Sequence, residues 1–214
     1  MKQILKVNRQ TKEGGWQFWV EYYEDYVIKI PKNKKDIRER VKKYLKSVDK
    51  LNELDKRVKD MITGIKEGEK IIKNSLLPLK YLAYLEFLDK GKIKQRRVII
   101  LEEYILKNTL KDNKKIIDSY IDLVKKLWQY GIHEKTFKFS HNYGVLENKV
   151  VLIDPFEITD KKQKVIKQIH KRSWQEAKKF NKHLPNEVVD YFISQADKNF
   201  TVKNLNKFWK AKLK

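Results

Sequence analysis

The segment His133–Glu157, which reads HEKTFKFSHNYGVLENKVVLIDPFE, constrains the fold more than any other part of the chain. Its second half contains two short apolar runs, Tyr143–Leu146 and Val150–Ile153, separated by Glu147-Asn148. Short runs of Val, Ile and Leu on both sides of a polar turn are typical of a β-hairpin. The sequence therefore predicts two paired, buried strands in this segment.

Two polar side chains stand at the open end of the predicted hairpin. Asn142 directly precedes the first strand and Asp154 directly follows the second, so strand pairing is expected to bring them together. An amide oxygen and a carboxylate that converge in this way suit Mg²⁺, which proteins usually hold through one or two oxygens together with substrate phosphates. The alternative is that both residues simply close the hairpin, and this segment alone does not decide between the two.

The charge of the chain favours partners that carry phosphate. Lys and Arg number 50 against 28 Asp and Glu, a formal net charge of +22. A field of this sign attracts nucleotides, nucleic acids, and anionic membrane or glycolipid surfaces. An excess of lysine also arises from genome composition or from adaptation to heat, so the charge by itself selects no function.

Composition further limits the class of protein. The hydrophobic fraction of 41% and the 5 Trp, 11 Tyr and 9 Phe indicate a folded chain, and 214 residues suffice for one or two domains. The absence of cysteine excludes disulfides, thiolate metal sites and a cysteine nucleophile. The N-terminus has no apolar signal core and no run is long enough to span a bilayer. We expect a cytoplasmic protein, either free or peripheral to the inner membrane surface.

The first hundred residues predict a five-stranded antiparallel sheet with helices inserted after its third strand. The inserted helices are expected at Asp36–Lys59 and Asp60–Asn74, and a loop with two glycines, Gly14-Gly15, follows the first strand. The five strands are expected at Gln3–Val7, Trp16–Tyr23, Tyr26–Ile30, Tyr81–Leu88 and Arg97–Tyr104.

Two charged residues interrupt apolar patterns in this half. Lys29 stands between Ile28 and Ile30 in the third strand, and Glu69 shares a helical stripe with Ile72. A buried charge is costly unless it is paired, so Lys29 and Glu69 are candidate partners. The alternative is that Lys29 points into water and that Glu69 is exposed in an irregular stretch.

The second half is predicted to be mainly helical. A long amphipathic helix at Lys111–Tyr130 ends at Gly131, and three more helices are expected at Lys161–Phe180, Glu187–Ala196 and Val202–Lys214. The last helix combines aromatic residues with several lysines. It is either an interfacial helix, which binds an anionic membrane or acceptor, or a terminal helix that packs its aromatics on the body.

The order of these parts resembles the protein-kinase-like superfamily over roughly residues 1–160. The stretch LLPLKYLAYLEF and the short second half are more similar to small bacterial lipopolysaccharide-core sugar kinases and aminoglycoside-phosphotransferase-like kinases than to eukaryotic protein kinases. The resemblance implies an α+β, two-lobed fold with a five-stranded N-lobe sheet in residues 1–105. It implies a mainly helical C-lobe in residues 106–214, with the catalytic-loop hairpin at 142–154.

The same resemblance implies that ATP and Mg²⁺ are cofactors. Lys29, in VIKI, would hold the phosphates and pair with Glu69, while Asn142 and Asp154 would hold the metal. Pro155-Phe156 replaces the family's Phe-Gly after this aspartate.

Two further parts of the nucleotide site are implied by the resemblance. The junction ILEEYI resembles the hinge, where adenine would contact the backbone of Glu103 and Ile105. Gly14 and Gly15 would form a reduced glycine loop, which covers a nucleotide without bringing its backbone as close to phosphate.

One departure from the family pattern bears on catalysis. The catalytic aspartate is expected five positions before the metal-binding asparagine, where this chain has Phe137. Glu134 is the nearby acid, and it is either a substitute base or a loop glutamate without a catalytic role.

Three functions therefore remain. The expected one is a phosphotransferase acting on a hydroxyl group of a glycolipid or small-molecule acceptor. The second is a pseudokinase, or an enzyme that transfers a group other than the γ-phosphoryl group. The third is a basic nucleic-acid-binding module, which the absence of any zinc-finger, RNP-type or recognition-helix signature disfavours.

Overall fold

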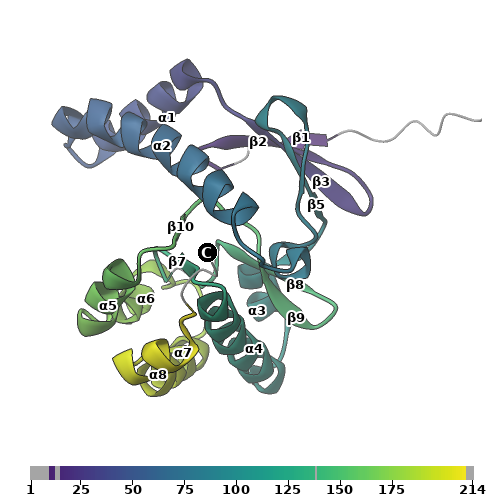
Figure 1. Cartoon of the computed structure of the whole chain (residues 1–214), viewed down its shortest axis with the longest axis vertical. Helices are drawn as coiled ribbons and strands as arrows, with labels where there is room; N and C mark the ends of the chain where they lie inside the picture. Colours follow the sequence, from purple (N-terminus) through teal and green to yellow (C-terminus); the bar gives the residue numbers. More distant parts are fainter. Residues whose placement is uncertain (1–9, 13–14, 138, 211–214) are drawn as a thin grey trace, which may run out of the picture. The chain divides into compact units, whose positions relative to one another are not determined.

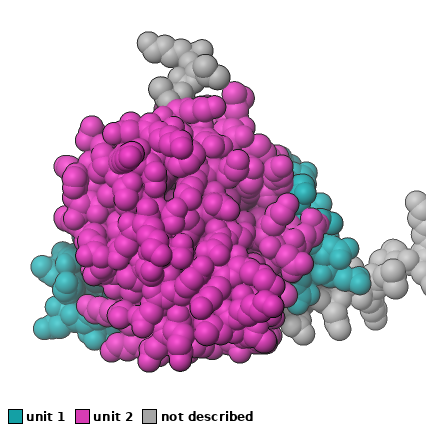
Figure 2. All heavy atoms as spheres, turned by 90° about the horizontal axis from the view of Figure 1, so that it is seen from below, with its two compact units in different colours: residues 1–66, 84–97 teal, residues 67–83, 98–214 magenta. Residues whose placement is uncertain are grey.

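The chain forms two compact units of an α+β protein with antiparallel sheets. The computed structural model describes residues 10–12, 15–137 and 139–210. Unit 1 comprises residues 1–66 and 84–97, and unit 2 comprises residues 67–83 and 98–214 (Figure 2). The predicted boundary after residue 105 therefore differs from the observed division, since the chain enters unit 2 at residue 98 and residues 67–83 also belong there.

Unit 1 is built on an antiparallel sheet in which β3 is the central strand. Every neighbouring pair is antiparallel, and the turn between β2 and β3 is closed by Tyr23 N, which donates to Tyr26 O at 2.9 Å. The strands lie in the order β1 (Gln10–Lys12), β2 (Phe18–Tyr22), β3 (Tyr26–Pro31), β5 (Ile93–Arg96) and β4 (Glu86–Phe87) (Figure 1).

The prediction of which segments form this sheet is wrong. The predicted strand Gln3–Val7 lies outside the described residues. The predicted strand Arg97–Tyr104 is not part of this sheet, because β6 (Ile99–Ile100) pairs with a strand of unit 2 and α3 (Leu101–Lys107) follows at once. Leu101 and Ile105 are both buried. Apolar residues four positions apart fit one face of a helix, and the same short apolar run also fits a strand, so the pattern alone does not distinguish the two.

The predicted strand Tyr81–Leu88 is also largely wrong. Its first residues belong to the 3₁₀ turn η2 (Leu79–Leu82), and Ala83 and Tyr84 both have positive φ, so extended backbone begins only at β4. A second 3₁₀ turn, η3 (Asp89–Gly91), then leads into β5.

The helical region between β3 and β4 starts and breaks at different places from those predicted. Helix α1 (Lys34–Ser47) is capped by Asn33, whose side chain accepts from Asp36 N at 2.9 Å. Asp49, with φ 53°, ends it, and the 3₁₀ turn η1 (Leu51–Glu53) leads into α2 (Leu54–Lys73). The core of this part of unit 1 consists of Ile37, Val41, Leu45 and Val58.

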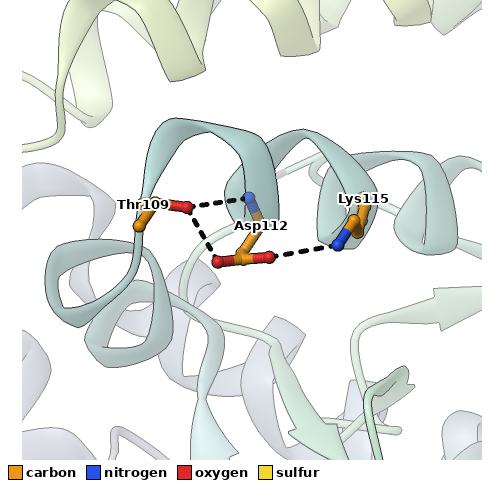
Figure 3. A network of polar contacts seen from close by, with 3 residues as sticks. All are labelled: Thr109, Asp112 and Lys115. Carbon is orange, nitrogen blue, oxygen red and sulfur yellow. Dashed lines mark hydrogen bonds and ion pairs between the residues drawn. The ribbon is translucent and has the colours of Figure 1, made fainter.

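Unit 2 is organised around α4 (Leu110–Gln129), which confirms the predicted long helix. Thr109 caps its first turn (Figure 3). At the other end Gly131 has φ +67°, Gly131 N donates to Trp128 O, and Ile132 N donates to Leu127 O, both at 3.0 Å. These two bonds form a Schellman motif, for which glycine is preferred because other residues resist positive φ.

The predicted hairpin is confirmed almost residue by residue. Strand β8 (Tyr143–Leu146) pairs with β9 (Lys149–Leu152), and Glu147 and Asn148 both have positive φ, as a two-residue hairpin turn of this hand requires. A second short pair, β7 (His133–Glu134) with β10 (Ile158–Thr159), holds the segments on either side of the hairpin together.

The C-terminal part of unit 2 is helical but more broken than predicted. Arg172, with φ 48°, interrupts the predicted helix Lys161–Phe180, and α8 ends at Phe208 with Leu205 fully buried. No helix among the described residues is long and apolar enough to cross a membrane. The elements are α5 (Lys162–His170), η4 (Ser173–Glu176), α6 (Ala177–Phe180), α7 (Asn186–Asn199) and α8 (Val202–Phe208).

Candidate metal and nucleotide site

The hairpin brings Asn142 and Asp154 together, as the sequence predicts. Asn142 O accepts from Ile153 N at 2.9 Å and from Asp154 N at 3.2 Å. The Asp154 carboxylate is half-buried, and its Oδ1 accepts from Phe156 N at 3.4 Å. The backbone of one residue therefore fixes the position of the other.

Two carboxylates hold the side-chain amide of Asn142. Asn142 Nδ2 donates to Glu134 Oε1 and to Glu157 Oε2, each at 3.0 Å. An ionised carboxylate accepts hydrogen bonds and does not donate them, so the group of Asn142 that faces Glu134 and Glu157 is its NH₂. The amide oxygen of Asn142 therefore points away from these two carboxylates. Among the described residues no hydrogen bond reaches Asn142 Oδ1, and the residue is buried, at 8% exposed.

Glu134 lies inside unit 2, where its environment favours the protonated form. Its Oε1 accepts from Thr136 N at 3.0 Å and from Thr136 Oγ1 at 2.6 Å, whereas its buried Oε2 has no partner among the described residues. Burial raises the pKa of Glu134 to about 7, Thr136 opposes this shift, and the charge of Glu157 adds to it. The carboxyl group is thus poised between its two forms near neutral pH.

His133, the neighbour of Glu134, is buried in the neutral form. Trp128 Nε1 donates to His133 Nδ1 at 3.0 Å, so the neutral ring carries its proton on Nε2. Burial lowers the pKa of His133 to about 3. His133 therefore supports the strand β7 rather than exchanging protons with solvent.

Phe137, at the position where the resemblance implies a catalytic aspartate, is part of the core. Its ring lies 4.6 Å from that of His133, 5.5 Å from that of Trp174 and 5.2 Å from that of Phe200, measured between centroids. The residue is 2% exposed and has φ 51°. The position five residues before Asn142 is therefore a packing position, and an acid there would be buried among aromatic rings.

The segment after Asp154 packs on α2. A Cβ built on Gly68 would come within 2.7 Å of Phe156 Cα and 3.1 Å of Pro155 O. Real side chains do not approach so closely, so glycine is needed for the helix to contact this backbone. The contact fixes the residues that follow Asp154.

Lys29 occupies the centre of the unit 1 sheet. It is half-buried, and its cross-strand partners in β2 and β5 are Val20 and Ile93, both buried. Because directly opposed residues share one face of a sheet, Lys29 stands on the apolar face. Its predicted role as a ligand of phosphates stays a prediction.

Glu69 has a partner close by in the same helix. Its Oε1 lies 2.6 Å from Lys73 Nζ, and both side chains are partly exposed. The predicted pairing of Glu69 with Lys29 stays a prediction, since these two residues belong to different units.

The remaining predicted nucleotide contacts fall at three different places. Gly14 lies outside the described residues, and Gly15 is exposed, with its carbonyl accepting from Lys32 Nζ at 2.9 Å. Glu103 and Ile105 lie within α3 instead of at a strand end, and Ile105 O already accepts from Asn113 Nδ2 at 2.9 Å. The chain passes between the two units at residues 66–67, 83–84 and 97–98, all of which precede Glu103 and Ile105 in the sequence.

A second polar cluster adjoins the hairpin. Glu102 Oε2 lies 2.8 Å from His141 Nδ1, and Glu102 Oε1 lies 2.7 Å from His183 Nε2. Within the described ranges no group of three or more histidine, cysteine, aspartate or glutamate side chains is arranged to hold a metal ion. The cluster ties α3 to the loop before β8 and to the loop before α7.

Sequence analysis missed Glu157 and Thr136 as members of the site. Glu157 could have been suspected, because it follows Asp154 by only three residues. No sequence pattern points to Thr136, because its contact with Glu134 depends on the backbone turn at residues 134–137. In comparisons with known proteins, no protein-family model matches this chain and no curated protein matches it in sequence.

Proposed function

We propose that the protein is a kinase-like phosphotransferase that binds ATP with Mg²⁺ and acts on a hydroxyl group of a glycolipid or small-molecule acceptor. The observation that carries this proposal is that Asp154 N donates to the backbone oxygen of Asn142 at 3.2 Å, while Glu134 and Glu157 hold the side-chain amide of Asn142 through its NH₂ group. An amide oxygen and a carboxylate held together suit Mg²⁺, whose remaining ligands are water and substrate phosphates.

In this proposal the metal ion neutralises negative charge on the phosphates. Asn142 and Asp154 would hold Mg²⁺ against the β- and γ-phosphates, where it neutralises charge that develops during transfer. Glu134 and Glu157 would be positioning residues, because they orient Asn142 without reaching the metal themselves. The charge of Glu157 also raises the local negative potential, which favours a divalent cation over a monovalent one.

Lys29 is the proposed ligand of the phosphates. Its place on the apolar face of the sheet would give it a strong preference for an anionic partner. Glu69 is the proposed second partner, and its exposed pair with Lys73 is weak enough to exchange, since such i,i+4 pairs contribute about 0.3–0.5 kcal/mol.

A nucleotide-binding pseudokinase is the second candidate. The observation that favours it is the burial of both candidate positions for a base: Phe137 lies among aromatic rings, and Glu134 Oε2 is closed to solvent. Phosphoryl transfer depends mainly on positioning and charge neutralisation, so loss of the base lowers the rate more than it lowers binding.

Thermal unfolding with ATP, with Mg²⁺ and with both together tests nucleotide binding. A ligand that binds only the folded state raises the melting temperature, so Mg-ATP should stabilise the natural protein. Asp154→Asn should abolish the Mg²⁺-dependent part of this shift. Asp122→Asn is the matched control, because Asp122 is an exposed residue of α4 that contacts Lys125, and it should shift as the natural protein does.

Turnover is measured separately. Release of ADP with an added glycolipid or sugar acceptor distinguishes the phosphotransferase from the pseudokinase, once binding is established. A natural protein that shows no shift with millimolar Mg-ATP would contradict both candidates.

A further inference from the structure

The segment that follows the candidate site carries the chain's positive charge in concentrated form. Residues 161–182 contain nine lysine or arginine residues and one acid, Glu176, whereas the whole chain has 50 basic and 28 acidic residues. The segment comprises α5, η4 and α6, which follow one another in unit 2 (Figure 1). The charge is therefore local and is more than a reflection of overall composition.

Most of these cations have no acidic partner. Arg172 pairs with Asp197 and Lys178 with Asp190. In the part of the chain that the structure describes, six others have no carboxylate partner: Lys161, Lys162, Lys164, Lys167, Lys171 and Lys182. Such a group of cations is self-repelling, and an anionic surface would relieve the repulsion.

Three of these lysines lie along one face of α5 and its C-cap residue, Lys171. Lys164, Lys167 and Lys171 recur at intervals of three and four residues and are exposed, while Val165 and Ile169 form the buried face. The helix is anchored to unit 2, because the Gln168 side chain donates to Lys135 O. The turn η4 that follows is held by Trp174 Nε1, which donates to Asp197 Oδ1 at 2.7 Å. The lysines thus form a fixed row.

An apolar side chain accompanies the row at the end of α6. Phe180 is 45% exposed, and Lys179 Nζ lies 6.0 Å from the centre of its ring. Lys178 and Lys182 flank it in sequence. An exposed aromatic among lysines suits the boundary between lipid headgroups and acyl chains, where the ring enters and the amines contact phosphates.

We propose that residues 161–182 form a docking surface for an anionic lipid bilayer, with lysines on lipid phosphates and Phe180 in the headgroup layer. Lysine predominates over arginine, and Phe180 is the one exposed Phe, Tyr or Trp of this segment. A bilayer therefore fits better than a nucleic acid, which is bound by rows of stacking aromatics and forked guanidinium groups.

Cosedimentation of the full chain with vesicles tests the proposal. One set of vesicles contains phosphatidylcholine alone. The other contains phosphatidylcholine with about 30% phosphatidylglycerol, which gives the surface a negative potential. The test variant is Lys164→Glu/Lys167→Glu/Lys171→Glu. The matched control is Lys35→Glu/Lys42→Glu/Lys46→Glu, which makes the same change in net charge on exposed lysines of α1. Melting temperatures establish that both variants fold.

The natural protein and the α1 control should bind the anionic vesicles and not the neutral ones, and the α5 variant should bind roughly tenfold or more weakly. Phe180→Ser should weaken binding without changing its salt dependence. Equal losses in the α1 and α5 variants would overturn the proposal, as would equal binding to neutral vesicles. Displacement by an oligonucleotide that needs the same three lysines would assign the surface to nucleic acid instead.

This proposal does not depend on the nucleotide site. Asp154→Asn should bind vesicles as the natural protein does, so failure of vesicle binding and failure of ATP binding are separate results.

Discussion

Gly68 lies directly against Phe156, two residues after Asp154, and a Cβ on Gly68 would come within 2.7 Å of Phe156 Cα. This contact joins the second half of α2 to the chain that leaves the hairpin. Because the neighbour is backbone, it cannot move aside as a flexible side chain does. The position of Asp154 thus depends on the absence of a side chain in a helix 86 residues earlier in the sequence.

The same helix supplies a control for this contact. Gly68→Ala should destabilise the protein and weaken Mg-ATP binding, because the added methyl group displaces Phe156. Gly64→Ala should stabilise it by about 0.5–1 kcal/mol, since nothing lies within 4 Å of a Cβ at that position and alanine is the better helix former. Denaturant unfolding measures the change in the free energy of unfolding for each variant. Equal changes in Gly68→Ala and Gly64→Ala would contradict the contact between Gly68 and Phe156.

Asn142 is expected to be sensitive to the exchange of its amide for a carboxylate. Asn142→Asp removes the donor shared by Glu134 and Glu157 and adds a third carboxylate, so it should cost about 2–5 kcal/mol at neutral pH. Asn142→Ala removes the donor without adding charge and should cost less. The penalty of the first variant should decrease on acidification, as one carboxyl group takes up a proton.

The adjacent residues His133 and Glu134 should have opposite effects on stability between about pH 4.5 and 6.5. The pKa of Glu134 is raised to about 7 in the folded state, so its contribution to stability is greatest at low pH and falls as pH rises from 4.5 to 7. The pKa of His133 is lowered to about 3, so its contribution is present above pH 6.5 and is lost as pH falls.

Single variants separate these two contributions. In Glu134→Gln the stability should fall more steeply than in the natural protein as pH drops from 6.5 to 4.5, by up to about 1.4 kcal/mol per pH unit. In His133→Asn, which keeps an acceptor for Trp128, the slope should change in the opposite direction. The measurement is the free energy of unfolding in urea at several pH values, and slopes that shift in the same direction would refute the assignment.

The N-terminus of α4 is expected to depend on Thr109 (Figure 3). Thr109 Oγ1 accepts from Asp112 N at 3.3 Å and donates to Asp112 Oδ2 at 2.7 Å, and it is the main reason that the pKa of Asp112 is lowered, ahead of Lys115. Thr109→Ala should reduce stability by about 1 kcal/mol through loss of the cap. It should also bring the pKa of Asp112 back toward 3.8, measured by NMR titration, while Thr109→Ser should preserve both properties.

Local patterns in the sequence predict the parts of the site that are close in the chain. The 143–152 hairpin follows from two apolar runs and a two-residue turn, and it alone places Asn142 beside Asp154. The helix before it follows from its 3.6-residue periodicity and from Gly131. In both cases the decisive interactions lie within a few residues of one another, so tertiary context had little to override.

Only the tertiary structure decided the rest. ILEEYIL has apolar residues that suit either a strand or a helix, and burial of Leu101 and Ile105 together selected the helix. Phe137 is a core residue because the rings of Trp174, in η4, and of Phe200, at the end of α7, pack against it. Glu157 reaches Asn142 because β7 and β10 pair. These contacts join residues that are distant in sequence, and their energies depend on burial and packing, which no local pattern encodes.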